Sequence, residues 1–144
     1  MIRTATIEDL PELHRMGKEF VSVTGYEGFS SYDFDSANDV FIELIRIGTI
    51  LIDGKNGMMG FMVFPVFFDK KSLIAQELFW WVDVEKRGSI LGVKMLKMAE
   101  NIAKDLGAKA FLMLSIHGLN GSKVNNLYKR MGYREHEETY IRGL

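Results

Sequence analysis

The sequence contains no cysteine. Disulfide bonds, thiolate nucleophiles and cysteine-based zinc sites are therefore excluded. Histidine is scarce as well, and His14, His117 and His136 lie too far apart along the chain to show a metal-ligand spacing. We expect no metal site.

No charge of one sign dominates, because the formal net charge is −1 and acidic and basic residues are interspersed. This balance argues against nucleic-acid binding driven by electrostatics. Apolar runs stay below the ~18 residues of a membrane span, and the N-terminus lacks the apolar stretch of a signal peptide. We therefore expect a cytoplasmic protein with no membrane contact. A length of 144 residues with 47% apolar residues favours one globular domain, residues 1–144.

The periodicity of apolar residues divides the chain into helices and strands. Gly54-Lys55-Asn56-Gly57 separates two β-rich runs and is a strong hairpin signal. Gly107 and Gly132 end two predicted helices. The predicted elements are, in order, a strand at 2–6, a helix from about residue 10, a helix that follows Ser36 and ends at Gly48, strands at 49–53, 58–68 and 73–84, a helix at 89–106, a strand at 109–116, a helix at 122–131 and one or two strands from Tyr133 onward.

This order, β-α-α-β-β-β-α-β-α-β(β), predicts an α/β fold of the α+β type with a mixed sheet. The hairpins must be antiparallel, whereas the strand–helix–strand unit from about residue 75 to 116 should be a right-handed parallel crossover. We therefore expect a mainly antiparallel sheet with a parallel fourth and fifth strand and with helices on both faces.

The most informative stretch runs from Ala75 to Leu106. An apolar strand enters a short charged turn that holds Arg87, Gly88 and Gly92, and an amphipathic helix follows. A glycine-containing turn at a helix N-terminus exposes backbone N–H groups beside the positive end of the helix dipole. Such a turn suits an anionic phosphate.

The order of elements, together with the segments WVDVEKRGSILGVKML and NNLYKRMGY, resembles the GNAT family of acetyl-CoA-dependent N-acetyltransferases. The resemblance extends over essentially the whole chain. It implies the GNAT fold, acetyl-CoA as co-substrate, and acetyl transfer to a primary amine by direct attack in a ternary complex. The lack of cysteine fits direct transfer. The acceptor, a small molecule or a protein amine, is not identified, and a homodimer stays open.

In that family a segment V-x-P-x-x-(Q/R)-x-x-G-x-(G/A) cradles the pyrophosphate of coenzyme A. Val82, Arg87 and Gly92 match it, whereas Val84 replaces the proline and Ile90 replaces the first glycine. A β-branched residue strongly disfavours positive φ, so Ile90 is expected to weaken pyrophosphate binding unless Gly88 adopts part of the turn conformation instead. The resemblance further implies that the exposed edge of the fourth strand binds pantetheine as an added strand would. The implied cofactor residues are Trp80, Trp81, Val82, Arg87, Gly88, Ser89, Ile90, Leu91, Gly92, Val93 and Asn120, the last displaced by one residue from the family's asparagine.

Two residues are candidates for catalysis. Glu77 interrupts an apolar run on the fourth strand, where many family members carry their base, and burial would raise its pKa usefully. Its alternative is a solvent-facing or ion-paired glutamate. Tyr128 precedes Gly132-Tyr133 by the family's spacing, which implies a general acid near the thioester sulfur. Its alternative is a core aromatic on an amphipathic helix.

Other residues are weaker candidates. Strand alternation sends Trp80 and Trp81 to opposite faces, one into the core and the other onto the face of Glu77. The aromatic residues between the first two helices form either a lid or partner surface or a loop folded onto the core. These are Tyr26, Phe29, Tyr32 and Phe34.

Ser115 and His117, at the mouth between the fifth strand and the last helix, are candidates to assist proton transfer, although a surface-loop histidine is the more common finding. The rival interpretation of the whole chain is a catalytically inactive GNAT-like structural or interaction protein that binds coenzyme A passively. Ile90 and the displaced Asn120 motivate it.

Overall fold

The computed structural model describes residues 1–116 and 121–144. Its strands form one five-stranded sheet in the order of the sequence. The strands are β1 (Arg3–Thr4), β2 (Ile50–Ile52), β3 (Gly57–Val66), β4 (Asp69–Val82) and β5 (Ala108–Leu112). The first four strands pair antiparallel, and β4 pairs parallel with β5. The predicted sheet type, including its parallel pair, is therefore confirmed.

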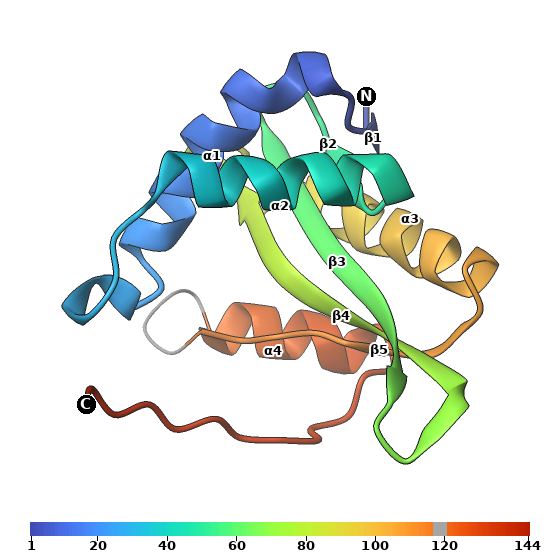
Figure 1. The fold of residues 1–144 in the computed structure, drawn as a ribbon. Coiled ribbons are helices and arrows are strands. Elements are labelled where there is room, and N and C mark those ends of the chain that lie inside the picture. Colours follow the sequence, from blue (N-terminus) through green and yellow to red (C-terminus); the bar gives the residue numbers. More distant parts are fainter. Residues whose placement is uncertain (117–120) are drawn as a thin grey trace.

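Helices cover both faces of this sheet (Figure 1). They are α1 (Leu10–Ser22), α2 (Phe34–Ile47), α3 (Leu91–Asp105) and α4 (Gly121–Arg130). One buried cluster joins α1 and α2 to the sheet through Leu13, Phe41 and Trp81. A second cluster joins α3 and α4 to the opposite face through Leu96, Ala99 and Tyr128. The predicted arrangement with helices on both faces is confirmed.

The predicted strands after Tyr133 are wrong. Residues 133–144 pair with no described strand and run as an extended, mostly exposed segment beside α4 (Figure 1). The stretch from Arg134 to Glu138 is charged at nearly every position and offers no apolar face that a strand could bury.

The fifth strand is also shorter than predicted. Its ladder with β4 stops at the pair Gln76–Leu112, and residues 113–116 are not part of the sheet. The backbone N–H and C=O groups of Leu114 instead bond the side chains of Glu77 and Tyr128. The long helix likewise spans residues 91–105 rather than 89–106, because Ser89 and Ile90 belong to the turn before it.

Candidate functional site

The sheet opens between β4 and β5. On one side β4 remains paired with β3 up to Gly57–Val82, whereas its pairing with β5 ends at Gln76. The last residues of β4 therefore have an unpaired edge among the described residues. The expected exposed edge of the fourth strand, Trp80 to Val82, lies at this opening.

Hydrogen-bond alternation identifies the backbone groups at the open edge. The N–H of Asp83 donates to the Asn56 carbonyl on the β3 side, so the Val82 carbonyl in the same peptide unit points the opposite way. Alternate residues of a strand share a direction, and Trp80 and Val82 therefore present their N–H and C=O groups to the opening, while Trp81 pairs with β3. The Val82 carbonyl accepts a hydrogen bond of 3.0 Å from Arg87 Nε.

A β-bulge decides which side chains face the site. Gly60 pairs with Phe79 and Phe61 pairs with Glu77, so Leu78 is an extra residue in β4. Strict alternation from Glu77 would bring Trp81 to the same face. The bulge reverses this.

Trp81 is only 5% exposed and packs in the cluster under α1 and α2. Trp80 lies on the other face beside Tyr128, with ring centroids 6.3 Å apart. The two tryptophans thus occupy opposite faces as expected, and Trp80 is the one that shares the surroundings of Glu77.

Glu77 and Tyr128 meet at one residue, Leu114. Glu77 is 6% exposed, and its Oε2 accepts a hydrogen bond of 3.1 Å from the Leu114 N–H. The Tyr128 hydroxyl donates to the Leu114 carbonyl at 2.7 Å. A carboxylate from β4 and a phenol from α4 therefore hold the chain just beyond β5. The solvent-facing and ion-paired alternatives for Glu77 do not describe this geometry.

Burial perturbs both groups. It raises the pKa of Glu77 to about 7, and the Leu114 N–H opposes the rise only in part. Burial also raises the pKa of Tyr128, and the neighbouring Glu77 charge adds to the rise. Glu77 can therefore exchange a proton near neutral pH, whereas Tyr128 keeps its proton.

A cavity of about 1320 Å³ lies between the end of β4, the turn before α3, and α4. Its walls carry basic side chains from the turn and from α4, and no carboxylate of residues 1–116 and 121–144 lines it. The lining residues are Trp80, Trp81, Val82, Val84, Lys86, Arg87, Gly88, Ser89, Ile90, Gly92, Val93, Lys123, Val124, Asn126, Leu127, Lys129 and Arg130. Nearly all the expected cofactor residues line this one cavity, although Leu91 does not. Asn120 and His117 lie outside the described residues.

The turn before α3 accommodates Ile90 without strain. Gly88 takes the left-handed conformation, with φ +81°, whereas Ile90 has φ −71° and ψ −7°. The Ile90 side chain is 63% exposed at the rim of the cavity. No side chain caps α3 at Ile90, and the first turn of α3 carries no acidic residue, so its N-terminus suits an anion.

Gly92 has a separate steric reason. A Cβ there would lie 3.1 Å from Trp80 Cζ2, which is tighter than ordinary contact. The glycine in this position therefore makes room for the indole ring.

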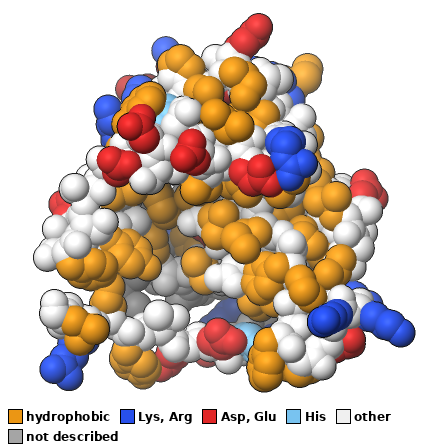
Figure 2. Space-filling view, viewed as in Figure 1, with side chains coloured by type: hydrophobic (Ala, Val, Ile, Leu, Met, Phe, Trp, Pro, Cys, Tyr) orange, Lys and Arg blue, Asp and Glu red, His pale blue; other side chains and the backbone are white. Residues whose placement is uncertain are grey.

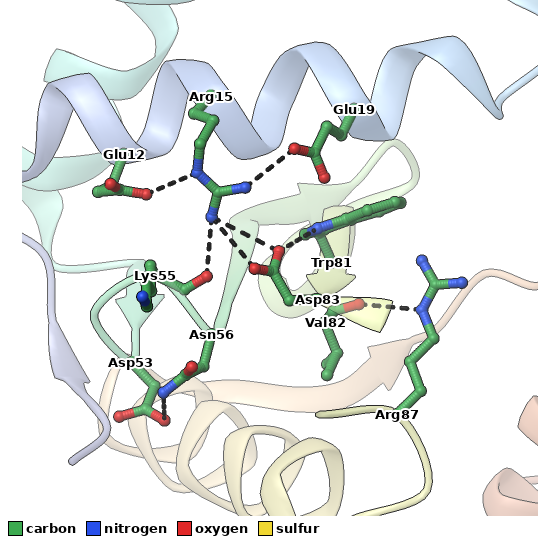
Figure 3. A network of polar contacts seen from close by, with 10 residues as sticks. All are labelled: Glu12, Arg15, Glu19, Asp53, Lys55, Asn56, Trp81, Val82, Asp83 and Arg87. Atoms are coloured by element: carbon green, nitrogen blue, oxygen red, sulfur yellow. Dashed lines mark hydrogen bonds and ion pairs between the residues drawn. The ribbon is translucent and has the colours of Figure 1, made fainter. Parts of the chain in front are cut away.

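A polar network fixes the end of β4 to α1 (Figure 3). Arg15 forms ion pairs with Glu12 and Glu19 on its own helix, at 2.8 and 2.9 Å. It also reaches the Lys55 carbonyl at 2.8 Å and Asp83 at 3.4 Å. Sequence reasoning missed this network because its members are far apart in the chain.

Asp83 also contacts the buried Trp81, which links the network to the core under α1 and α2. It accepts a hydrogen bond of 3.0 Å from Trp81 Nε1. The Arg87 guanidinium lies 4.6 Å from the centroid of the Trp81 ring. The end of β4 and the start of the turn are therefore held from both sides (Figure 3).

The aromatic residues from Tyr26 to Phe34 fit neither interpretation as a group, because some fold onto the core and others stay on the surface. Tyr32 folds onto the protein, where its hydroxyl lies 2.7 Å from Nδ1 of the buried His14. Tyr26 and Phe29 stay half exposed. Phe34, which is the first residue of α2, is also half exposed, but its ring stacks on His14 with centroids 3.8 Å apart. Figure 2 shows apolar side chains beside a hollow on this face of the molecule, with acidic side chains over α2.

Two further observations bear on the expected absences. No cluster of His, Asp or Glu with metal-binding geometry occurs within residues 1–116 and 121–144. None of the helices that the structure describes is long and apolar enough to cross a membrane.

No protein-family model matches the sequence, and no curated protein matches it either. Solved structures do match over the full length. A transcriptional regulator from Bacillus halodurans C-125 has a TM-score of 0.75 at 18% identity, with 100% of this chain and 99% of that chain covered. The acetyltransferase AAC(6')-Iy, in complex with the bisubstrate analog CoA-S-monomethyl-acetylneamine, has a TM-score of 0.74 at 11% identity, with 100% and 97% covered.

A GNAT family acetyltransferase from Staphylococcus aureus subsp. aureus USA300_TCH1516 has a TM-score of 0.67 at 17% identity, with 100% and 98% covered. The TM-scores over the whole chain show a shared fold, and at identities this low they show the fold alone. Together with the mixed sheet, the opening between β4 and β5 and the helices on both faces, they show that this chain has the fold of the GNAT acetyltransferases.

Proposed function

We propose that the protein is an N-acetyltransferase that transfers acetyl from acetyl-CoA to a primary amine. The observation that carries this proposal is the buried Glu77, with its pKa near 7, on the strand whose open edge borders a basic cavity. Two of the similar structures support the choice of co-substrate, since AAC(6')-Iy is seen with CoA and with a CoA bisubstrate analog.

The residues of the cavity fit coenzyme A. In the segment from Arg87 to Val93, at the positive end of α3, the backbone N–H groups of Gly88, Ile90, Gly92 and Val93 would hold the pyrophosphate. The N–H groups of Arg87 and Ser89 already donate to carbonyls of the turn, and that of Leu91 donates to Ser89 Oγ. The outward N–H and C=O groups of Trp80, and the N–H of Val82, would bind the pantetheine amides as an added strand does. Arg87 Nε already donates to the Val82 carbonyl, so a pantetheine amide that donated there would share this acceptor with the guanidinium or displace it.

The proton transfers are assigned to Glu77 and Tyr128. Bound acetyl-CoA would supply an acetyl group activated as a thioester. An alkylamine has a pKa of about 10 and must lose a proton before or during its attack, and Glu77 would accept that proton directly or through water. Tyr128, which keeps its proton at neutral pH, would donate to the departing thiolate after turning from the Leu114 carbonyl.

The rival, an inactive module of the same fold, was motivated mainly by Ile90. The backbone at Ile90 has negative φ and its side chain points largely into solvent, so this motivation is weak. Burial also makes the charged form of Glu77 costly, and the hydrogen bond from the Leu114 N–H opposes that cost only in part.

Thermal unfolding with and without acetyl-CoA tests the cofactor proposal. A ligand at 100 times its dissociation constant stabilises a protein by ~2.7 kcal/mol, which gives a clear rise in melting temperature. A thiol-release assay against a panel of amines, from small amines to peptides, then tests transfer. No thermal shift at millimolar acetyl-CoA would favour the inactive module.

Variants assign the roles. Glu77→Gln and Tyr128→Phe should each slow turnover with little change in acetyl-CoA affinity. Glu43→Gln is the matched control, because that glutamate is exposed on α2, far along the chain from the site, and forms its ion pair with Arg46 of the same helix. Full activity in both site variants would remove the proposed roles and leave the fold unaffected.

A further inference from the structure

The wall of the cavity formed by α4 is basic along one stripe. Lys123, Asn126, Leu127 and Arg130 all line the cavity, and their spacing of i, i+3, i+4 and i+7 places them on one face of the helix. The Cα atoms of Lys123 and Arg130, at the ends of this stripe, are about 10 Å apart along the helix axis, a span that two long side chains can close toward one group. The opposite wall carries its own cations, Lys86 and Arg87.

The stripe is not neutralised by the protein. Within the described residues, Lys123 and Arg130 form no ion pair, and α4 itself contains no acidic residue. Lys129, which also lines the cavity, differs because it pairs with Glu135 at 3.2 Å. In the part of the chain that the structure describes, no carboxylate lines the cavity.

The turn and the N-terminus of α3 already provide for one diphosphate, through their backbone N–H groups and the helix dipole. The α4 stripe therefore offers binding capacity for another anionic group of the same ligand. Coenzyme A carries such a group, since a phosphomonoester on its ribose adds roughly −1.5 to −2 of charge at pH 7.

We infer that Lys123 and Arg130 bind the 3′-phosphate of coenzyme A and make the protein select coenzyme A over dephospho-coenzyme A. The inference rests on the proposed function, because it adds a specificity determinant to the same cavity. Charge-assisted contacts from both cations account for a preference of at least about tenfold. Raising the ionic strength reduces the preference, because both cations are exposed to solvent.

Isothermal titration calorimetry with coenzyme A and dephospho-coenzyme A tests this, at 50 mM and at 300 mM salt. The wild-type protein should bind coenzyme A at least about tenfold more tightly at low salt. The double variant Lys123→Met, Arg130→Met should lose most of that ratio by weakening coenzyme A alone. Lys97→Met is the matched control, because Lys97 is an exposed lysine of α3 that does not line the cavity.

Each outcome is decisive. Equal affinities for the two ligands in the wild type, or a ratio that survives in the double variant, overturn the inference while coenzyme A binding and the proposed function stand. Failure of both ligands to bind the wild type overturns the proposed function and the inference together. Circular dichroism of the double variant confirms that a lost ratio does not come from unfolding.

Discussion

The buried carboxyl of Glu77 makes the stability of the protein depend on pH. Its pKa is about 7 in the folded chain, against an ordinary value of 4.5. Between these values the folded state holds a proton that the unfolded state releases, so the free energy of unfolding falls as pH rises through this window. At about 1.36 kcal/mol per pH unit, the fall amounts to about 3 kcal/mol by the time pH exceeds 7.

Glu77→Gln removes this dependence. Glutamine has nearly the same shape, does not titrate, and keeps an oxygen that can accept from the Leu114 N–H. Urea unfolding at pH 5, 6, 7 and 8 should therefore show the wild type losing about 2.5 kcal/mol relative to the variant across the range. The comparison uses the slopes against pH, so a constant cost of the substitution does not affect it.

Glu43→Gln again serves as control. Arg46 lowers the pKa of this exposed carboxyl, so its removal leaves the fall between pH 5 and pH 8 in place. Parallel pH profiles for wild type and Glu77→Gln would refute the argument, because they would mean that Glu77 carries the same proton in both states.

Activity should also depend on the ionisation of Glu77, but it should rise with pH where the free energy of unfolding falls. If Glu77 is the base, kcat/KM rises with pH through an apparent pKa near 7, and Glu77→Gln lowers it by about 10²- to 10⁴-fold. The rising limb should be missing from the residual activity of the variant. A limb that persists unchanged would assign it to another group.

Other variants probe the rest of the site. Tyr128→Phe should reduce turnover at least about tenfold with unchanged acetyl-CoA affinity, measured by thiol release and calorimetry, and an unchanged rate would exclude it as the acid. Gly88→Ala should cost about 1–2 kcal/mol of stability through its left-handed backbone and should weaken cofactor binding, whereas Gly28→Ala, which also adds a Cβ in open space, should cost little. Equal melting temperatures of these two alanine variants would contradict the role of φ. Asp83→Ala should destabilise by about 1–3 kcal/mol in urea because it leaves the Trp81 indole N–H without its acceptor, and Asp83→Asn should recover most of the loss; no difference between the two would show that this bond is dispensable.

The order of elements could be read from the sequence because its signals are local. Helical and strand periodicities lie within single segments, and Gly54 to Gly57 form the expected hairpin connection. Gly107 and Gly132 both adopt positive φ where a predicted helix ends. Each of these features is determined by residues within a few positions of one another.

Features that depend on distant partners were predicted less well. Sequence patterns extended the fifth strand to Ile116, but the Leu114 backbone bonds Glu77 and Tyr128 in place of a neighbouring strand. A strand after Tyr133 needs a partner edge, and the sequence does not state whether one is within reach.

The turn before α3 shows how a departure from a motif can mislead. From the sequence we expected Ile90 to weaken the pyrophosphate site, because a β-branched residue tolerates positive φ poorly. The chain instead takes its left-handed turn at Gly88 and leaves Ile90 as an ordinary helix-entry residue. Replacing Ile90 with glycine is therefore expected to leave acetyl-CoA affinity nearly unchanged in calorimetry, and a marked tightening would show that the exposed side chain obstructs the ligand.

The position of Glu77 depends on the bulge in β4. The sequence indicates where a bulge could occur but not which side chains it turns to which face. An isolated glycine within a strand, such as Gly60, often marks a bulge or a close approach. The structure shows the reason for this glycine, because a Cβ at Gly60 would lie 2.2 Å from the Phe79 ring across the ladder. The Phe79 ring packs against Phe41 of α2, and Phe79 and Trp81 both lie in the α1–α2 core. Because Leu78 is an extra residue in β4, Glu77 faces the opposite side of the sheet. There Glu77 and Tyr128 both bond the backbone of Leu114. Strict alternation would place Glu77, Phe79 and Trp81 on one face, and the carboxyl would then lie in the apolar α1–α2 core, on the side of the sheet opposite Tyr128.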